Sequence, residues 1–134
     1  MCAQCVKEPL LETPRAFVFD RGAPIRFKED QIEGFAAFMI YQWIQLDLNV
    51  PDLIAPMPDK SSQKLAKAFA RAIRAPYREI FREKGGGISL RKDLDEDLDI
   101  LLIDCANPMP LLQGASRAVS ETMPKKALIF TLIS

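Results

Sequence analysis

The chain has 134 residues, 49% of them hydrophobic and 27% charged, so it is long enough for one domain with a substantial core. Its 18 basic and 18 acidic residues leave a net charge of zero, which excludes a bulk attraction to nucleic acid or acidic membranes. The chain contains no histidine, which excludes His-dependent catalytic triads and His-type zinc catalysis.

A strand and a long helix are predicted in the first third of the chain. Residues 15–20 alternate in polarity and end in a turn, which indicates a short strand, and we expect it at an edge of the sheet. Between about residues 29 and 47 apolar side chains recur at helical spacing. Phe38 and Leu46 lie outside this stripe, so the helix is predicted to be covered on more than one face.

The middle of the chain continues the alternation of strand and helix. Residues 53–56 indicate a brief buried strand. Residues 60–74 form the clearest amphipathic helix, with Ser61 or Ser62 as its N-cap. Residues 77–81 are compatible with a third strand or with an extension of this helix.

Two continuous apolar runs predict the central strands. They span residues 100–103 and 128–133, and such runs are typical of strands covered on both faces by helices. A helix over residues 111–123 lies between them, whereas residues 85–87 mark a loop and residues 93–99 a solvated acidic turn. The element order predicts a doubly wound α/β domain with a mainly parallel sheet of four to five strands.

Several segments then carry a family resemblance. They are the motif Cys2-Ala-Gln-Cys5 with the strand that follows it, the segment Ile25-Arg26-Phe27-Lys28, the segment Asp52-Leu53-Ile54-Ala55-Pro56-Met57-Pro58, and the acid Asp104 after a buried strand. In this order they resemble the competence protein F (ComF) branch of the type I phosphoribosyltransferases over nearly the whole chain. The resemblance implies a phosphoribosyltransferase-like domain over residues 15–134, after a remnant of a zinc-ribbon-like segment over residues 1–14.

The resemblance also assigns two ligand loops. It places Met57 and Lys60 on the pyrophosphate-side loop, and Asp104, Cys105 and Asn107 on the ribose-phosphate loop. Cys105 stands where the family has its second acid, and Pro108-Met109-Pro110 stands where it has Thr-Thr-Gly. Two prolines remove two backbone N–H donors from the cradle that would hold a phosphate at a helix N-terminus.

These departures imply a protein with a degenerate ribose-phosphate loop, non-catalytic and acting in DNA uptake or processing through a protein partner. Such a protein is expected to need no cofactor. The alternative is an active phosphoribosyltransferase that uses 5-phosphoribosyl-1-pyrophosphate and Mg²⁺. In that alternative Asp104 would contact the ribose, Lys60 would lie near the pyrophosphate, and the backbone N–H groups of Leu111 and Leu112 would hold the phosphate.

Two further patterns leave alternatives open. Cys2 and Cys5 provide half of a structural zinc site, which needs four ligands, so zinc is not expected unless two chains share it. A cationic stripe advances by four, three, four and three residues and so lies on one helical face; its members are Lys60, Lys64, Lys67, Arg71 and Arg74. The stripe is either a solvated helix face or a contact for the phosphates of single-stranded nucleic acid. No apolar run reaches the ~18 residues of a membrane span, so we expect a cytoplasmic protein without membrane contact.

Overall fold

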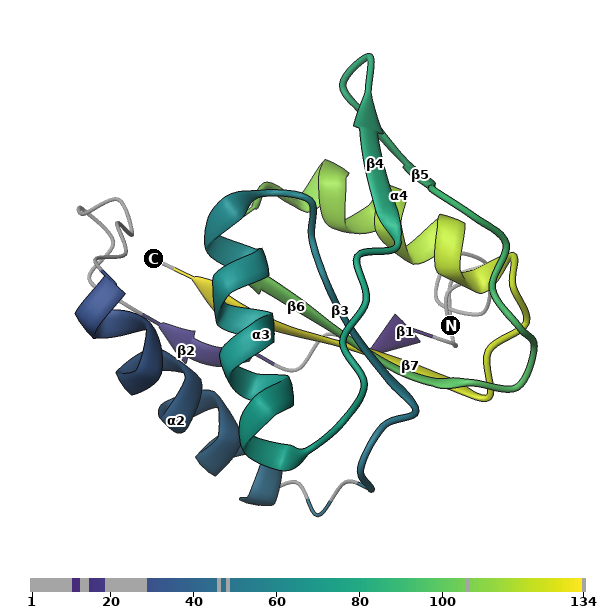
Figure 1. Ribbon diagram of the computed structural model, residues 1–134. Helices are drawn as coiled ribbons and strands as arrows, with labels where there is room; N and C mark the ends of the chain where they lie inside the picture. The colour runs from purple at the N-terminus through teal and green to yellow at the C-terminus, as the bar shows by residue number, and fades with distance from the viewer. Residues whose placement is uncertain are drawn as a thin grey trace, which may run out of the picture.

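A five-stranded parallel sheet forms the centre of the computed structural model (Figure 1). The structure describes residues 11–12, 15–18, 29–45, 47, 49–105 and 107–133. The elements in chain order are β1 Leu11–Glu12, β2 Arg15–Val18, α2 Glu29–Gln45, β3 Leu53–Pro56, α3 Lys60–Ile73, β4 Phe81–Lys84, β5 Gly87–Leu90, β6 Asp99–Cys105, α4 Met109–Ser120 and β7 Lys126–Ile133.

The two apolar runs of the sequence occupy the middle of this sheet. β6 lies between β3 and β7, with Leu101 opposite both Ile54 and Leu128. β1 and β2 both pair with the other edge of β7, in parallel. The doubly wound α/β fold with a mainly parallel sheet is therefore confirmed, and the described part of the 15–20 segment pairs only with β7 within the described chain, as expected of an edge strand.

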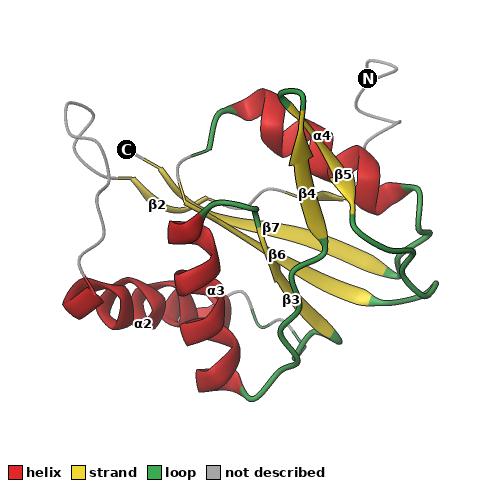
Figure 2. Ribbon diagram, turned by 45° about the horizontal axis from the view of Figure 1, so that its top comes forward, coloured by secondary structure: helices red, strands yellow, loops and turns green. Residues whose placement is uncertain are grey.

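Helices cover both faces of the sheet (Figure 2). On one face α2 and α3 pack through Met39, Leu65 and Phe69 onto alternate residues of β6 and β7. On the other face α4 packs through Ala115 and Val119 onto the intervening residues of the same strands. Because successive strand residues point to opposite faces, the continuous apolar runs supply both cores.

Helix α3 begins at Lys60, as the sequence indicates, but its N-cap is not one of the predicted serines. The N-cap is Asp59, whose carboxylate accepts the backbone N–H of Ser62 at 3.0 Å, so the prediction of Ser61 or Ser62 as the cap was wrong. Asp59 has extended backbone and leaves both serines inside the first turn. The helix ends at Ile73, and its C-cap Arg74 adopts the left-handed conformation with φ 57°.

Helix α2 buries one face against α3 and the sheet. Leu46 lies outside the described residues, so cover on a second face of this helix stays a prediction. Met39 is fully buried, whereas Phe38, Tyr41 and Ile44 are 53%, 59% and 58% exposed. The apolar residues around α2 therefore exceed what α3 and the sheet can cover.

A β-hairpin stands where the sequence indicated a strand and a loop. Tyr77 makes a single parallel bridge to Ile54 at the outer edge of β3. The chain then forms an antiparallel pair, β4 and β5, whose turn needs the positive φ angles of Gly85 and Gly86. The hairpin projects from the body of the molecule beside α4 (Figure 1). No helix in the described ranges is long and apolar enough to cross a membrane.

Candidate functional site

The parallel sheet brings three polar segments to one edge. The carboxyl ends of β3, β6 and β7 lie side by side, so Asp59, Asp104 and Thr131 come together although they are far apart in the sequence. In open α/β sheets this edge is where ligands bind. It is therefore the first place to examine for a functional site.

Asp104 is the centre of this edge, and it has no exposed surface. Its Oδ2 accepts the hydroxyl of Thr131 at 2.5 Å, and its Oδ1 accepts the side-chain amide of Asn107 at 2.5 Å. The backbone N–H of Asn107 lies a further 3.3–3.4 Å from the two carboxylate oxygens. Burial raises the pKa of Asp104, and the hydrogen bonds from Thr131 and Asn107 oppose this shift.

Asn107 links two carboxylates. Its Nδ2 donates to Asp59 Oδ1 at 2.8 Å as well as to Asp104 Oδ1. Asp59 in turn caps α3 through the N–H of Ser62. Asn107 therefore connects the loop after β6 by hydrogen bonds to Asp104 on β6 and to Asp59 at the start of α3.

The same arrangement decides whether a divalent cation fits here. Mg²⁺ binds carboxylate oxygens at about 2.0–2.1 Å and needs the space between them. The Nδ2 of Asn107 fills the space between the carboxylates of Asp59 and Asp104. The residues present therefore do not fit Mg²⁺ at this position. The described part of the chain also contains no group of three or more Cys, Asp or Glu side chains arranged to hold a metal.

Cys105 is buried beneath this network. Its backbone N–H donates to the hydroxyl of buried Ser62 at 2.9 Å. Burial, together with the nearby carboxylates of Asp59 and Asp104, raises the pKa of the Cys105 thiol to about 12. The thiol is therefore protonated at neutral pH, which makes it a poor nucleophile.

Two backbone donors at the start of α4 are also engaged. The N–H groups of Leu111 and Leu112 both donate to the carbonyl of Pro108, at 3.0 and 3.3 Å. Pro108 and Pro110 have no N–H to offer. Proline is well tolerated in the first turn of a helix, where Pro110 lies in α4. The N-cap residue Pro108 makes no side-chain hydrogen bond to the helix.

The structure separates the two residues that the resemblance places on the pyrophosphate side. Met57 is fully buried and packs in the core on the α4 face of the sheet, so its side chain does not face a ligand at this edge. Lys60 is exposed on the first turn of α3. Cys2 and Cys5 lie outside the described residues.

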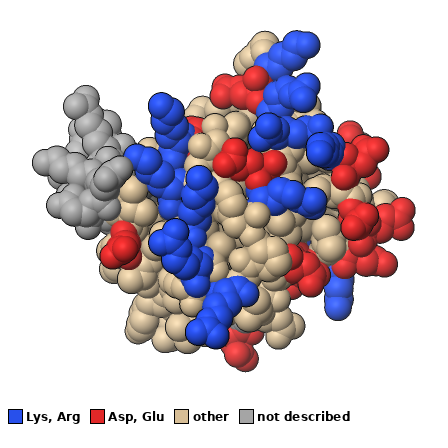
Figure 3. Space-filling model, in the orientation of Figure 1, with Lys and Arg blue, Asp and Glu red and all other residues tan. Residues whose placement is uncertain are grey.

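The cationic stripe lies where its spacing predicts. All five members are exposed along one side of α3, which contains no acidic residue. Figure 3 shows a ridge of cations along α3 and a second group of cations over the hairpin, with acidic side chains most numerous at the opposite margin and others lying between and beside the two groups.

Sequence reasoning missed three residues of the polar network: Asp59, Ser62 in its role as acceptor, and Thr131. The signal for Asp59 was its place directly before an amphipathic helix, where Asp is a favoured N-cap. Thr131 is a lone polar residue in an apolar strand, and such a residue needs a partner when buried.

Comparison with known proteins supports the fold, through solved structures alone. No protein-family model matches the chain, and no curated protein sequence matches it. A solved purine phosphoribosyltransferase from Pyrococcus horikoshii Ot3 superposes with a TM-score of 0.58 at 14% identity, covering 82% of this chain and 87% of that one. The hypoxanthine-guanine phosphoribosyltransferase of L. donovani has a TM-score of 0.48 at 15% identity, covering 79% and 70% of the two chains. The first of these similarities shows that the chain adopts a phosphoribosyltransferase-like fold.

Proposed function

We propose that this protein uses a phosphoribosyltransferase-like fold for binding rather than for phosphoribosyl transfer. The observation that carries the proposal is the complete burial of Asp104, whose carboxylate is engaged by Thr131 and Asn107. A carboxylate that accepts hydrogen bonds from ribose hydroxyls must be accessible to the ligand. Here the side chain of Asn107 would first have to leave both of its carboxylate partners.

The phosphate side of the same site supports this proposal. A phosphate at a helix N-terminus is held by free backbone N–H groups. At the start of α4 two positions are proline, and the N–H groups of Leu111 and Leu112 already donate to Pro108. The alternative of an active enzyme relies on these two donors, so it needs the first turn of α4 to rearrange.

Calorimetry with 5-phosphoribosyl-1-pyrophosphate and Mg²⁺ tests the proposal. We expect no binding at ligand concentrations up to the millimolar range, and no pyrophosphate release with purine or pyrimidine bases. Micromolar binding that Lys60→Ala weakens at least tenfold would overturn it, with the exposed Arg117→Ala on α4 as the control. Lys60 is preferred over Asp104 because it is exposed, so its replacement leaves the core intact.

The family resemblance implies a role in DNA uptake or processing, with a protein partner, and the α3 stripe supports a direct contact with single-stranded nucleic acid. From Lys60 to Arg74 its cations extend over about 21 Å at the α-helical rise of 1.5 Å per residue. No acidic residue of α3 interrupts them. A ridge of this kind can follow the phosphates of one strand.

Salt dependence distinguishes this contact from a solvated helix face. Three to five phosphate contacts should give a log–log slope of about −2 to −3.5 for a single-stranded oligonucleotide, at roughly −0.7 per phosphate. The double variant Lys64→Glu/Arg71→Glu should abolish binding. The control Arg117→Glu/Lys125→Glu changes the net charge equally at exposed positions outside α3 and should retain it. Equal losses in both variants, or no salt-sensitive binding by the wild type, would refute the contact.

A further inference from the structure

A cleft of about 260 Å³ opens on the flank of the molecule, beside the outer edge of β3. Residues 78–80 and 91–94 line it. The first segment follows Tyr77, whose bridge to Ile54 marks the outer edge of β3. The backbone N–H of Arg91 donates to the carbonyl of Ile80 at 2.8 Å, which ties the two walls together. The cleft therefore belongs to the framework that carries the hairpin.

The lining of the cleft combines an apolar surface with cations. Ile80 is buried and Leu94 half-buried, and both belong to the core on this side of the sheet. Arg78, Arg91 and Lys92 are exposed around them. An amphipathic anion, with a flat apolar part and a charged end, matches this composition.

One of the two acidic residues of the lining is already engaged. Glu79 accepts the hydroxyl of Tyr77 at 3.0 Å and lies 3.7 Å from the guanidinium of Arg91. Burial and the contact with Glu79 raise the pKa of Tyr77, so its hydroxyl remains a donor. Within the described residues the side chains of Arg78 and Lys92 form no ion pair. These two cations are available to an anion from solution, with exposed Asp93 as the remaining acidic side chain of the lining.

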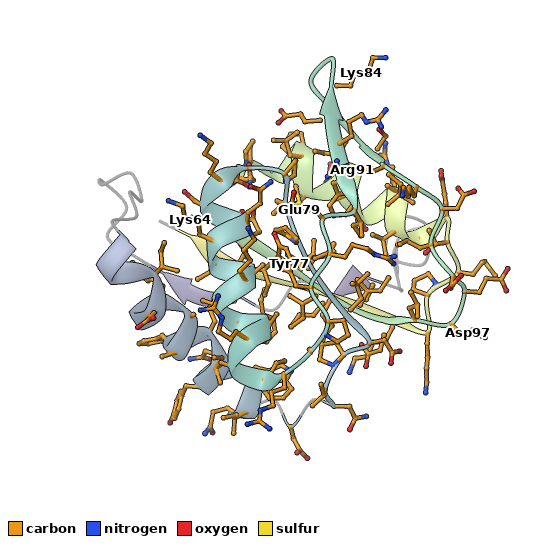
Figure 4. All side chains as sticks on the ribbon, in the orientation of Figure 1. Lys64, Tyr77, Glu79, Lys84, Arg91 and Asp97 are labelled. Carbon is orange, nitrogen blue, oxygen red and sulfur yellow. The ribbon has the colours of Figure 1, made fainter. Side chains whose placement is uncertain are left out.

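The cleft adjoins the cationic stripe of α3. The Nζ of Lys67 lies 5.7 Å from the centre of the Tyr77 ring, and Tyr77 leads through Glu79 to Arg91. Figure 4 shows Tyr77 and Glu79 between α3 and the base of the hairpin, with Arg91 next to them. A nucleic-acid strand bound along the cationic stripe of α3 would reach the cleft next to Tyr77.

We infer that the cleft binds a single nucleotide unit, with its phosphate on Arg78 and Lys92 and its base against the half-buried Leu94. Pockets for drug-sized ligands have volumes of about 300–1,000 Å³, so the smaller cleft admits one unit and not two. The nucleotide is either a free nucleoside monophosphate or the 5′-phosphorylated end of a strand held on α3. The second source rests on the proposed function, whereas the first does not.

Binding of defined probes tests the inference. The probes are adenosine monophosphate, inorganic phosphate, and an oligothymidylate with either a 5′-phosphate or a 5′-hydroxyl. The cleft variant is Arg78→Ala/Lys92→Ala and the control is Arg117→Ala/Lys125→Ala; all four positions are exposed, and an unchanged melting temperature verifies the fold. We expect the cleft variant to weaken binding of a phosphorylated probe at least tenfold, and the control less than twofold.

The probes separate the possible outcomes. Loss of adenosine monophosphate binding in the cleft variant identifies the free nucleotide, and a preference for the 5′-phosphorylated strand that the variant removes identifies the strand end. Salt-sensitive binding of both strands that the cleft variant leaves unchanged refutes the cleft while the α3 contact stands. Inorganic phosphate that binds as tightly as adenosine monophosphate refutes the role of the apolar lining. No binding of any probe refutes both proposals.

Discussion

Replacing Asn107 with alanine tests whether the polar network at the carboxyl edge of the sheet stabilises the fold. The change removes the two hydrogen bonds from Nδ2, at 2.5 Å to Asp104 and 2.8 Å to Asp59. It keeps the backbone N–H of residue 107, which lies 3.3–3.4 Å from the Asp104 carboxylate. Thr131 then remains as the only side chain among the described residues that donates to Asp104.

The expected loss follows from the burial of the two acceptors. A hydrogen bond to a charged group contributes about 1.5–3 kcal/mol, and the upper part of this range applies to fully buried Asp104. Asp59 is only half-buried, so its bond contributes less. The free energy of unfolding should fall by about 3 kcal/mol, which corresponds to roughly 10 °C in melting temperature for a chain of this size.

The loss should also depend on pH. Burial raises the folded-state pKa of Asp104, and the hydrogen bonds from Asn107 lower it. Without them the folded pKa rises further, so the folded state holds its proton over a wider range than the unfolded state. Stability then declines more steeply as pH rises from about 4, the unfolded value, through the folded pKa. The variant should lose less stability at pH 4 than at pH 7.5.

Urea denaturation at both pH values, followed through Trp43 fluorescence, measures these effects. Asn49→Ala, at an exposed loop position, is the matched control and should stay within about 0.5 kcal/mol of the wild type. A loss below about 0.5 kcal/mol for Asn107→Ala, or an equal loss at both pH values, would refute the reasoning. Asn107→Asp places a third carboxylate between Asp59 and Asp104, so it should be less stable still and should recover part of the loss with millimolar Mg²⁺.

Three other outcomes are expected from the same structure. Asp104→Asn should abolish the decline in wild-type stability between about pH 4 and the raised folded pKa of Asp104. Urea denaturation across pH measures this decline, and an unchanged decline in the variant would show that another group causes it. Gly114→Ala should stabilise the fold by about 1 kcal/mol, because the added methyl would meet Ile88 Cβ at an ordinary 3.6 Å within a helix; destabilisation would show that the hairpin cannot shift on α4. In a variant without the two N-terminal cysteines, iodoacetamide should modify Cys105 in the folded protein at least tenfold more slowly than in urea, since the thiol is buried and its pKa is raised to about 12; equal rates, read by mass spectrometry, would contradict its burial.

The sheet could be predicted because its signals are local. Residues 100–103 are apolar throughout and residues 128–133 are apolar except for Thr131, and the structure extends these runs only to Asp99–Cys105 and Lys126–Ile133. The period of the helix from residue 60 likewise places its end within one residue of the observed Ile73. In each case the pattern of a single segment states which faces are buried.

The hairpin could not be predicted from local pattern. β4 consists of Phe81 and three charged residues, and β5 includes a glycine and a serine. β4 has no alternation after Phe81, and β5 alternates over only four residues, which is too short a pattern to predict a strand. Their pairing is stabilised from outside, because Phe81, Ile88 and Leu90 pack with the core beneath α4. Such tertiary contacts override weak intrinsic preference.

Only the local part of the candidate site could be predicted from the sequence. Asp104 follows a buried strand, so its place at the carboxyl edge of the sheet can be inferred from the sequence alone. Its partners cannot be inferred, because Thr131 lies 27 residues away and Asn107 reaches Asp59 across 48 residues. The position of an acid is a local property, whereas its burial and its hydrogen-bond partners depend on the whole sheet.

The two surfaces of the molecule differ in what they can offer a ligand. At the carboxyl edge of the sheet, a ligand must break hydrogen bonds from Asn107 and desolvate a carboxylate that is already satisfied, so part of its binding free energy is lost to that exchange. On the flank, the cations of α3, Arg78 and Lys92 are exposed to solvent, and an anion need not displace a protein carboxylate from Arg78 or Lys92. The proposed function therefore predicts that an anion binds at the flank, even though ligands of open α/β sheets usually bind at the carboxyl edge of the sheet.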